Sequence, residues 1–209
     1  MSPNLALFIL VVLLVVGWFA AGTQVNVRKG HAALRWLQEG LPLLGEKTTL
    51  RWLGSSVVEL KINQAKTPFR EAEVLFVLEP RDVPPLWALA RLRGRRDLFL
   101  FRGTLRGHQG TELEVFDPRS WSAQGIDHRC KERGWSPLPL AEPLRAYTSG
   151  QPASVEEILK LAELAGCPLV RLSLHRKEPE LEVHWQLGHL RKHPSPAVLE
   201  TLRRIAGGL

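Results

Sequence analysis

The chain has 209 residues, a formal net charge of +7 at pH 7 and only two cysteines. This positive charge is typical of proteins attracted to anionic lipid headgroups or to nucleic acid. The low cysteine content argues against a small disulfide-stabilised secreted domain. Apolar content is ordinary for a globular protein, so the chain can bury a hydrophobic core.

The N-terminal segment is strongly apolar. Residues 5–21 are almost purely apolar, and no charged side chain precedes Arg28. A helix over this run spans about 25 Å, and two further residues bring it close to the ~30 Å hydrocarbon core of a bilayer. We therefore predict a single transmembrane anchor over residues 1–25. A cleaved signal peptide is the alternative, because residues 20–22 are small, but the N-terminus lacks Lys and Arg and the apolar run is long.

The charges that flank this segment predict its orientation. Arg28, Lys29 and Arg35 follow the apolar run closely, and no basic residue precedes it. The positive-inside rule places the basic side in the cytoplasm. We expect a single-pass protein of the cell membrane with its N-terminus outside and its C-terminal domain cytoplasmic. The three basic residues are candidates to face anionic lipid.

Residues 26–47 are predicted to form a juxtamembrane helix and linker. The helix is expected over 26–39, with Gly40 and Pro42 ending it. Two interpretations remain open, since this helix could lie on the membrane surface or pack on its own domain.

Residues 48–133 are predicted to form a first α+β half. Alternating apolar residues favour strands over 48–53, 58–62 and 71–79. Pro84 and Pro85 suit the first turn of a helix over 82–93, for which we expect Leu86, Leu89 and Ala90 to face inward. Residues 98–101 and 112–116 then read as a hairpin.

The C-terminal part has the clearest pattern. Residues 134–153, which hold four prolines, are predicted to be a connection, and residues 154–209 a second α+β half. Ser154 and Glu157 form a capping box that starts a helix, strands are expected over 169–174 and 181–187, and Ser195 starts a last helix.

The two halves share an order of elements. A helix, an apolar strand, a turn and a Glu-Leu-Glu-Val strand occur at 82–116 and again at 154–187. This could be a duplicated module or a chance recurrence of a common unit. Either way, we predict an α+β fold in which the transmembrane helix precedes antiparallel hairpins with helices packed on one face.

Motifs for chemistry are scarce. The sequence contains no GxSxG, GxxxxGK[ST], HExxH, CxxC or GxGxxG motif, and we expect no cofactor. His175 and His184 could be cross-strand neighbours in the last hairpin, and with Glu182 they would suit a divalent metal. The alternative, solvated side chains on a polar strand face, is favoured over a metal site.

A dense basic cluster follows the predicted helix at 82–93. It consists of Arg91, Arg93, Arg95 and Arg96. Guanidinium groups match phosphate geometry, so a lipid headgroup, RNA or an acidic protein surface could bind here. Stabilisation of the helix C-terminus and pairing with Asp97 and strand glutamates are the competing explanations. Nucleic acid is the weaker partner because Phe99 and Phe101 fit a core strand better than a base-stacking surface.

These observations favour a non-catalytic binding or scaffold module at the membrane surface, with the lipid bilayer and another protein as partners. Two alternatives remain. One is a metal-dependent or hydrolytic enzyme that uses His175, His184 and a nearby carboxylate. The other is a membrane-associated nucleic-acid binder that uses the basic cluster at 91–96.

Overall fold

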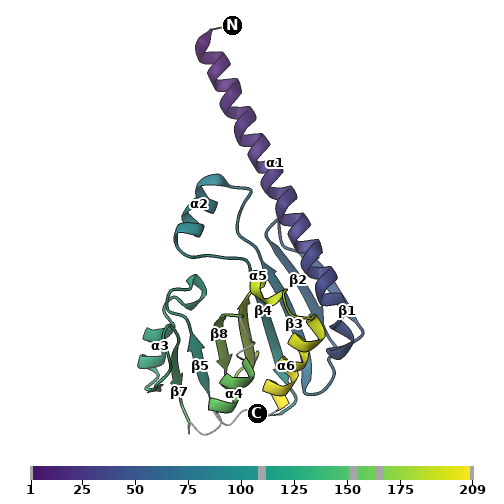
Figure 1. Cartoon of the computed structure of the whole chain (residues 1–209), viewed down its shortest axis with the longest axis vertical. Helices are drawn as coiled ribbons and strands as arrows, with labels where there is room; N and C mark the ends of the chain where they lie inside the picture. Colours follow the sequence, from purple (N-terminus) through teal and green to yellow (C-terminus); the bar gives the residue numbers. More distant parts are fainter. Residues whose placement is uncertain (1, 108–111, 151–154, 163–166, 208–209) are drawn as a thin grey trace.

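The structure is a computed structural model that describes residues 2–107, 112–150, 155–162 and 167–207. It is an α+β fold in which a long apolar helix precedes an antiparallel sheet with helices (Figure 1). The helical elements are α1 (Pro3–Gln38), η1 (Leu41–Leu43), α2 (Pro84–Leu92), η2 (Trp121–Ala123), α3 (Ile126–Glu132), α4 (Val155–Ala162), α5 (Leu187–Leu190) and α6 (Ser195–Gly207). The strands are β1 (Thr48–Trp52), β2 (Val57–Ile62), β3 (Phe69–Val77), β4 (Leu98–Leu105), β5 (Leu113–Phe116), β6 (Ser136–Leu138), β7 (Arg145–Thr148), β8 (Leu169–Leu174) and β9 (Leu181–Gln186).

The strands of the two predicted halves share one sheet. Its nine described strands lie in the order β1-β2-β3-β4-β9-β8-β5-β7-β6. Each neighbouring pair is antiparallel, and β4 joins β9 while β5 joins β8. The β8–β9 hairpin of the C-terminal part is therefore inserted between β4 and β5.

This order overturns the hairpin predicted for residues 98–101 and 112–116. β4 pairs with β3 and β9, and β5 pairs with β7 and β8. Both strands are almost entirely buried, so each needs a hydrogen-bonding partner along both edges. The edges through which β4 and β5 would pair with each other are taken by β9 and β8, the two strands of the C-terminal hairpin.

The predicted Pro-rich connection contains two strands, β6 and β7. Pro137 lies in β6, the last strand of the sheet, and pairs with Tyr147. An edge strand tolerates proline because the missing amide proton can point away from the ladder. The capping-box residue Ser154 lies outside the described residues, although α4 begins immediately after it.

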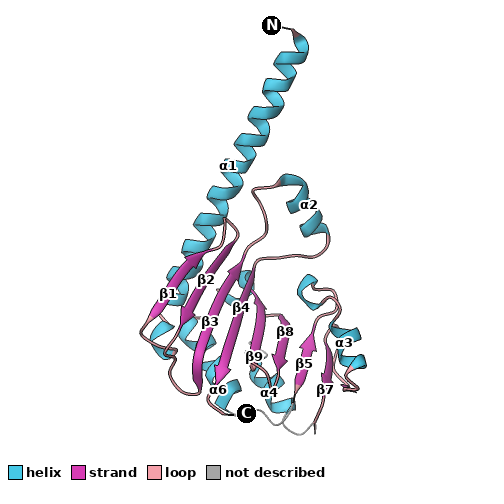
Figure 2. Ribbon diagram, turned by 180° about the vertical axis from the view of Figure 1, so that it is seen from behind, coloured by secondary structure: helices cyan, strands magenta, loops and turns pink. Residues whose placement is uncertain are grey.

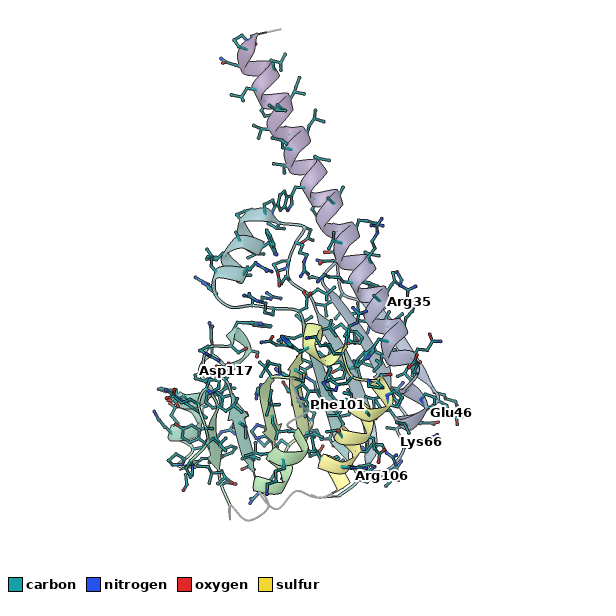
Figure 3. The ribbon with its side chains drawn as sticks, in the orientation of Figure 1. Arg35, Glu46, Lys66, Phe101, Arg106 and Asp117 are labelled. Atoms are coloured by element: carbon teal, nitrogen blue, oxygen red, sulfur yellow. The ribbon has the colours of Figure 1, made fainter. Side chains whose placement is uncertain are left out.

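The main core lies between the sheet and the helices α1, α4 and α6. Leu181, Val183 and Trp185 alternate along β9 and are completely buried against these helices. Phe101 of β4 lies in the same interior, and α6 contributes Leu199 and other apolar residues (Figure 3). Seen from behind, the strands lie in front of α4 and α6, which shows that those helices cover one face of the sheet (Figure 2).

Helix α1 changes character along its length. It is 36 residues long and continuous, so the predicted anchor and juxtamembrane helix are one element. Large apolar side chains between residues 5 and 19 are 40–65% exposed. From Gly22 onward one face is buried, at Gly22, Asn26, Gly30, Ala33 and Leu37. Of the two interpretations for residues 26–39, packing on the protein's own domain is the one observed.

Helix α2 is rotated relative to the predicted orientation. Ala90 is buried, as expected, but Leu86 and Leu89 are nearly half exposed. The residues of α2 that face the protein are Ala90 and Trp87, whose indole donates a hydrogen bond to Glu79. The leucine spacing predicts an apolar face on the helix, but it does not show whether that face meets the protein core.

Candidate membrane-facing site

The exposed part of α1 is the only helix among the described residues that is long and apolar enough to cross a membrane. Its most apolar 18-residue window has a mean hydropathy of 2.8 and is only 6% buried within the protein. A core helix of a soluble protein would bury such a surface, whereas an anchor or a signal sequence would not. This segment is therefore a candidate membrane span.

A buried polar cluster joins α1 to the sheet domain where the exposed part ends. Asp97 accepts two hydrogen bonds from the Arg81 guanidinium, at 2.8 and 2.9 Å, and one from Lys29 at 2.8 Å. The Glu79 amide also donates to Asp97 at 2.8 Å. Asn26, which is fully buried on α1, donates to the Glu79 carbonyl at 3.0 Å and accepts from Arg81 at 3.1 Å.

The charge of Asp97 in this cluster is set by burial and by the hydrogen bonds that it accepts. Burial alone would raise the pKa of Asp97, but hydrogen bonds from Arg81, Lys29 and the Glu79 amide outweigh it and lower this pKa. Asp97 is therefore ionised at neutral pH and compensates the two cations that face it. Because Lys29 and Asn26 come from α1, these bonds fix the direction of the helix relative to the sheet.

A second contact lies about two turns closer to the N-terminus. The Trp18 indole donates a 2.9 Å hydrogen bond to the Arg81 carbonyl oxygen. The rings of Trp18 and Trp87 lie 6.1 Å apart, so α2 packs beside the last turns of the apolar run. Both ribbon views show α2 next to α1, beyond the end of the sheet (Figures 1 and 2).

The three basic residues predicted to lie near the membrane are in different environments. Arg28 and Arg35 are exposed, and Lys29 is bound to Asp97. Arg35 lies beside the sheet domain, on the outer side of α1 (Figure 3). It is roughly 20 Å along the helix from residue 21, whereas Arg28 is roughly 10 Å from it. Arg28 is thus much closer to the end of the apolar run.

The cluster of Arg91, Arg93, Arg95 and Arg96 is gathered at the end of α2, but its members have different contacts. Arg91 forms an ion pair with Glu79 at 3.3 Å. Arg95 lies over the Trp121 ring at 4.6 Å, and burial lowers its pKa. Arg96 donates to two backbone carbonyls of its own turn, and Arg93 is exposed at the helix end. The predicted pairing of this cluster with Asp97 is wrong, because Asp97 binds Arg81 and Lys29. The predicted pairing with a strand glutamate is found at Arg91, whose partner Glu79 ends the predicted strand at 71–79.

A charged row crosses the sheet face opposite the main helices. In register across six strands it comprises Lys61, Glu73, Arg102, Glu182, Ser173 and Glu114. Opposite charges alternate along its first four positions, and Arg171 links the last two carboxylates. Its guanidinium lies 2.8 Å from Glu114 and 3.3 Å from Glu182.

The two histidines of the predicted metal site lie in this network but do not meet. His184 is paired across the strands with Arg171, so the two histidines are not cross-strand neighbours. His175 contacts Glu114 at 2.8 Å, and His184 contacts Glu182 at 2.6 Å. Within the described ranges, no group of three His, Cys, Asp or Glu side chains is arranged to hold a metal ion.

Burial sets the protonation state of the histidine next to Glu182. Burial and the nearby arginines lower the pKa of His184 despite its bond to Glu182, so the ring is neutral at pH 7. Because Glu182 accepts at Nε2, the proton lies on that nitrogen, and buried Nδ1 has no partner among the described residues. Burial alone would raise the pKa of Glu182, yet the His184 hydrogen bond and two arginines lower it to about 2.

The sequence contained weak signals for these partners. Arg81, Asp97, Glu114 and Arg171 were not among the predicted site residues. Arg171 and Glu114 each interrupt an apolar strand with a charge, which indicates a position on the second face of the sheet. Comparison of the chain with protein-family models and with curated proteins gave no match.

Proposed function

We propose that this protein is a single-pass membrane protein whose sheet domain is a non-catalytic binding or scaffold module on the cytoplasmic side. The observation that carries the proposal is the change along α1. Its side chains up to residue 19 are exposed and apolar, and its residues from Gly22 onward pack into the domain. A bilayer would cover the first part and leave the second part bound to the sheet.

The contacts of the apolar segment favour a retained anchor over a cleaved signal peptide. Cleavage near residue 22 would remove Trp18 and its hydrogen bond to Arg81, and it would free the α1 surface against which α2 packs. A signal peptide is removed from the mature protein and has no role in its packing. Here the part of α1 that contacts the domain extends back to Trp18, inside the apolar segment.

Two features support the cytoplasmic orientation and the non-catalytic role. Arg28 and Lys29 follow the apolar run and no basic residue precedes it, which matches the positive-inside pattern. On the open sheet face, the carboxylates of Glu114 and Glu182 are occupied by Arg171 and the two histidines. Such mutual pairing is typical of a structural network and leaves these groups less available for acid–base chemistry.

Topology labelling tests the anchor directly. We would express the full chain with Ser2→Cys or Glu132→Cys and treat intact cells with a membrane-impermeant maleimide. We expect Ser2→Cys to react in intact cells and Glu132→Cys to react only after permeabilisation. The protein should stay in the membrane after alkaline extraction, and its mature mass should include residues 1–22. Reaction of Glu132→Cys in intact cells, or a mature N-terminus near residue 22, would contradict the proposal.

The binding role has a separate test. Purification of the full chain from membranes in mild detergent should recover one stoichiometric partner protein after chemical crosslinking. Recovery of the chain alone, under conditions in which it remains folded, would contradict a scaffold role while leaving the anchor intact.

A further inference from the structure

Helix α2 presents an apolar face away from the protein. Leu86 is 48% exposed, Leu89 45% and Leu92 86%. Successive residues of a helix are about 100° apart, so these three leucines lie within an arc of about 120°. Trp87 lies on the opposite side of α2, and buried Ala90 lies between Trp87 and Leu86 around the helix. A short surface helix normally buries its large apolar side chains, whereas α2 turns Trp87 and Ala90 toward the protein and leaves three leucines exposed.

The position of α2 is fixed by its contacts with α1. Trp87 packs against Trp18, and Trp18 is bonded to the Arg81 carbonyl three residues before α2 begins. Trp18 lies in the last turns of the apolar run. A bilayer that covers residues 5–21 therefore ends at the level of α2, where an amphipathic tryptophan is favoured.

The charges at the end of α2 match the same environment. Arg93 and Arg96 are exposed and follow the leucine face directly. Arg91 is held by Glu79, and Arg95 lies over Trp121, whereas neither Arg93 nor Arg96 has a carboxylate partner among the described residues. Guanidinium groups at the headgroup level bind lipid phosphates and are attracted to an anionic leaflet.

We propose that α2 is an interfacial helix, whose Leu86, Leu89 and Leu92 enter the boundary between headgroups and acyl chains of the leaflet from which α1 emerges, with Arg93 and Arg96 on lipid phosphates. The occupant of the leucine face is thus bilayer lipid, because α2 lies beside the last turns of the exposed apolar run of α1, at the level where a bilayer covering that run would end (Figure 1). The inference rests on the proposed membrane anchor. It adds a second attachment, so that α1 and the sheet domain together are held at a fixed tilt relative to the bilayer.

Depth measurements on the full chain test this proposal. We would reconstitute it into nanodiscs of phosphatidylcholine with phosphatidylglycerol and attach a nitroxide at Leu89→Cys or Leu92→Cys. The native cysteines, Cys130 and Cys167, are buried and compete little for the label. Accessibility to oxygen, which concentrates in lipid, is compared with accessibility to a water-soluble nickel complex. Val12→Cys in the apolar run and Glu132→Cys on exposed α3 are the lipid and water controls.

We expect labels at both leucine positions to have an oxygen-to-nickel ratio several-fold above that at Glu132→Cys and below that at Val12→Cys. Combining Arg93→Gln and Arg96→Gln should shift the Leu92→Cys label toward water. Values equal to those at Glu132→Cys, with Val12→Cys in lipid, would overturn the α2 proposal alone. Values typical of water at Val12→Cys would instead overturn the anchor. Shielding of the leucine labels from both reagents would show that protein covers the face and would also overturn the proposal.

Discussion

Gly22 of α1 lies directly against the backbone of Arg81: a Cβ atom on this glycine would be 2.2 Å from the Arg81 carbonyl oxygen. The contact is with backbone, which cannot rotate away as a side chain could. Gly22 therefore allows α1 to approach the loop that leads into α2, and the Trp18 bond to the same carbonyl depends on that approach.

Gly22→Ala should consequently destabilise the fold. Overpacking of this kind costs about 1–3 kcal/mol, which lowers Tm by roughly 2–4 °C per kcal/mol for a chain of this size. Thermal unfolding in mild detergent, followed by tryptophan fluorescence, measures it. Gly17→Ala is the matched control, because nothing lies within 4 Å of a Cβ at that position. Equal Tm values for the two variants would contradict the close contact.

Asp97→Asn should weaken the connection between α1 and the sheet. Asp97 and Arg81 are only 12% and 14% exposed, and the amide would leave Lys29 without a counter-charge and Arg81 with only a 3.5 Å contact to Glu79. Removing one partner of a buried ion pair costs about 3 kcal/mol or more, to be measured by urea unfolding in detergent. Asp117→Asn is the control, because Asp117 pairs with the exposed Arg119 and such pairs contribute about 1 kcal/mol or less. Similar losses in both variants would argue against a special role for Asp97.

Local periodicity was sufficient to predict most elements of this fold. The alternation of Leu181, Val183 and Trp185 identifies β9 and its buried face, and the spacing in α6 identifies its core positions. The partners of the strands were not predictable in the same way. β4 and β5 are neighbours in sequence and were expected to pair, but pairing depends on edges supplied by a distant hairpin.

The candidate site shows the same limit. The hairpin register, in which Leu174 pairs with Leu181, places Arg171 opposite His184, so that a guanidinium takes the position where a second histidine was expected. The leucines of α2 gave the correct helix but the wrong inner face. The spacing of leucines on a helix is the same whether their face packs against a protein core or contacts lipid.

Glu182 should contribute a pH-dependent part of the stability. Its pKa is lowered from an ordinary 4.5 to about 2 in the folded protein. A lowered carboxyl pKa stabilises the fold above the ordinary value, and this stabilisation, up to about 3 kcal/mol, is lost as the pH falls from about 4.5 to about 2. Glu182→Gln should therefore be less stable at pH 7 and lose less stability over that interval.

The change in stability between pH 4.5 and pH 2 should differ between Glu182 and a carboxylate on the protein surface. Glu178 lies just before β9, is largely exposed and pairs with exposed Arg70. Glu178→Gln should leave both the stability at pH 7 and its decline between pH 4.5 and 2 close to those of the unmodified chain. Urea unfolding at several pH values gives both quantities. If Glu182→Gln loses as much stability between pH 4.5 and pH 2 as the unmodified chain, the contacts of Glu182 do not favour its ionised form.

Cys130 and Cys167 should be unreactive in the folded protein. Both are buried, in separate apolar clusters, and burial raises the pKa of each thiol to about 11. At pH 8 only about one thiol in a thousand would then be a thiolate, the form that attacks a disulfide reagent. We expect no rapid reaction with such a reagent in the native protein, and two thiols titrated after denaturation. Glu132→Cys should add one fast thiol, because it lies on exposed α3; fast reaction of both native thiols would show that these clusters open readily.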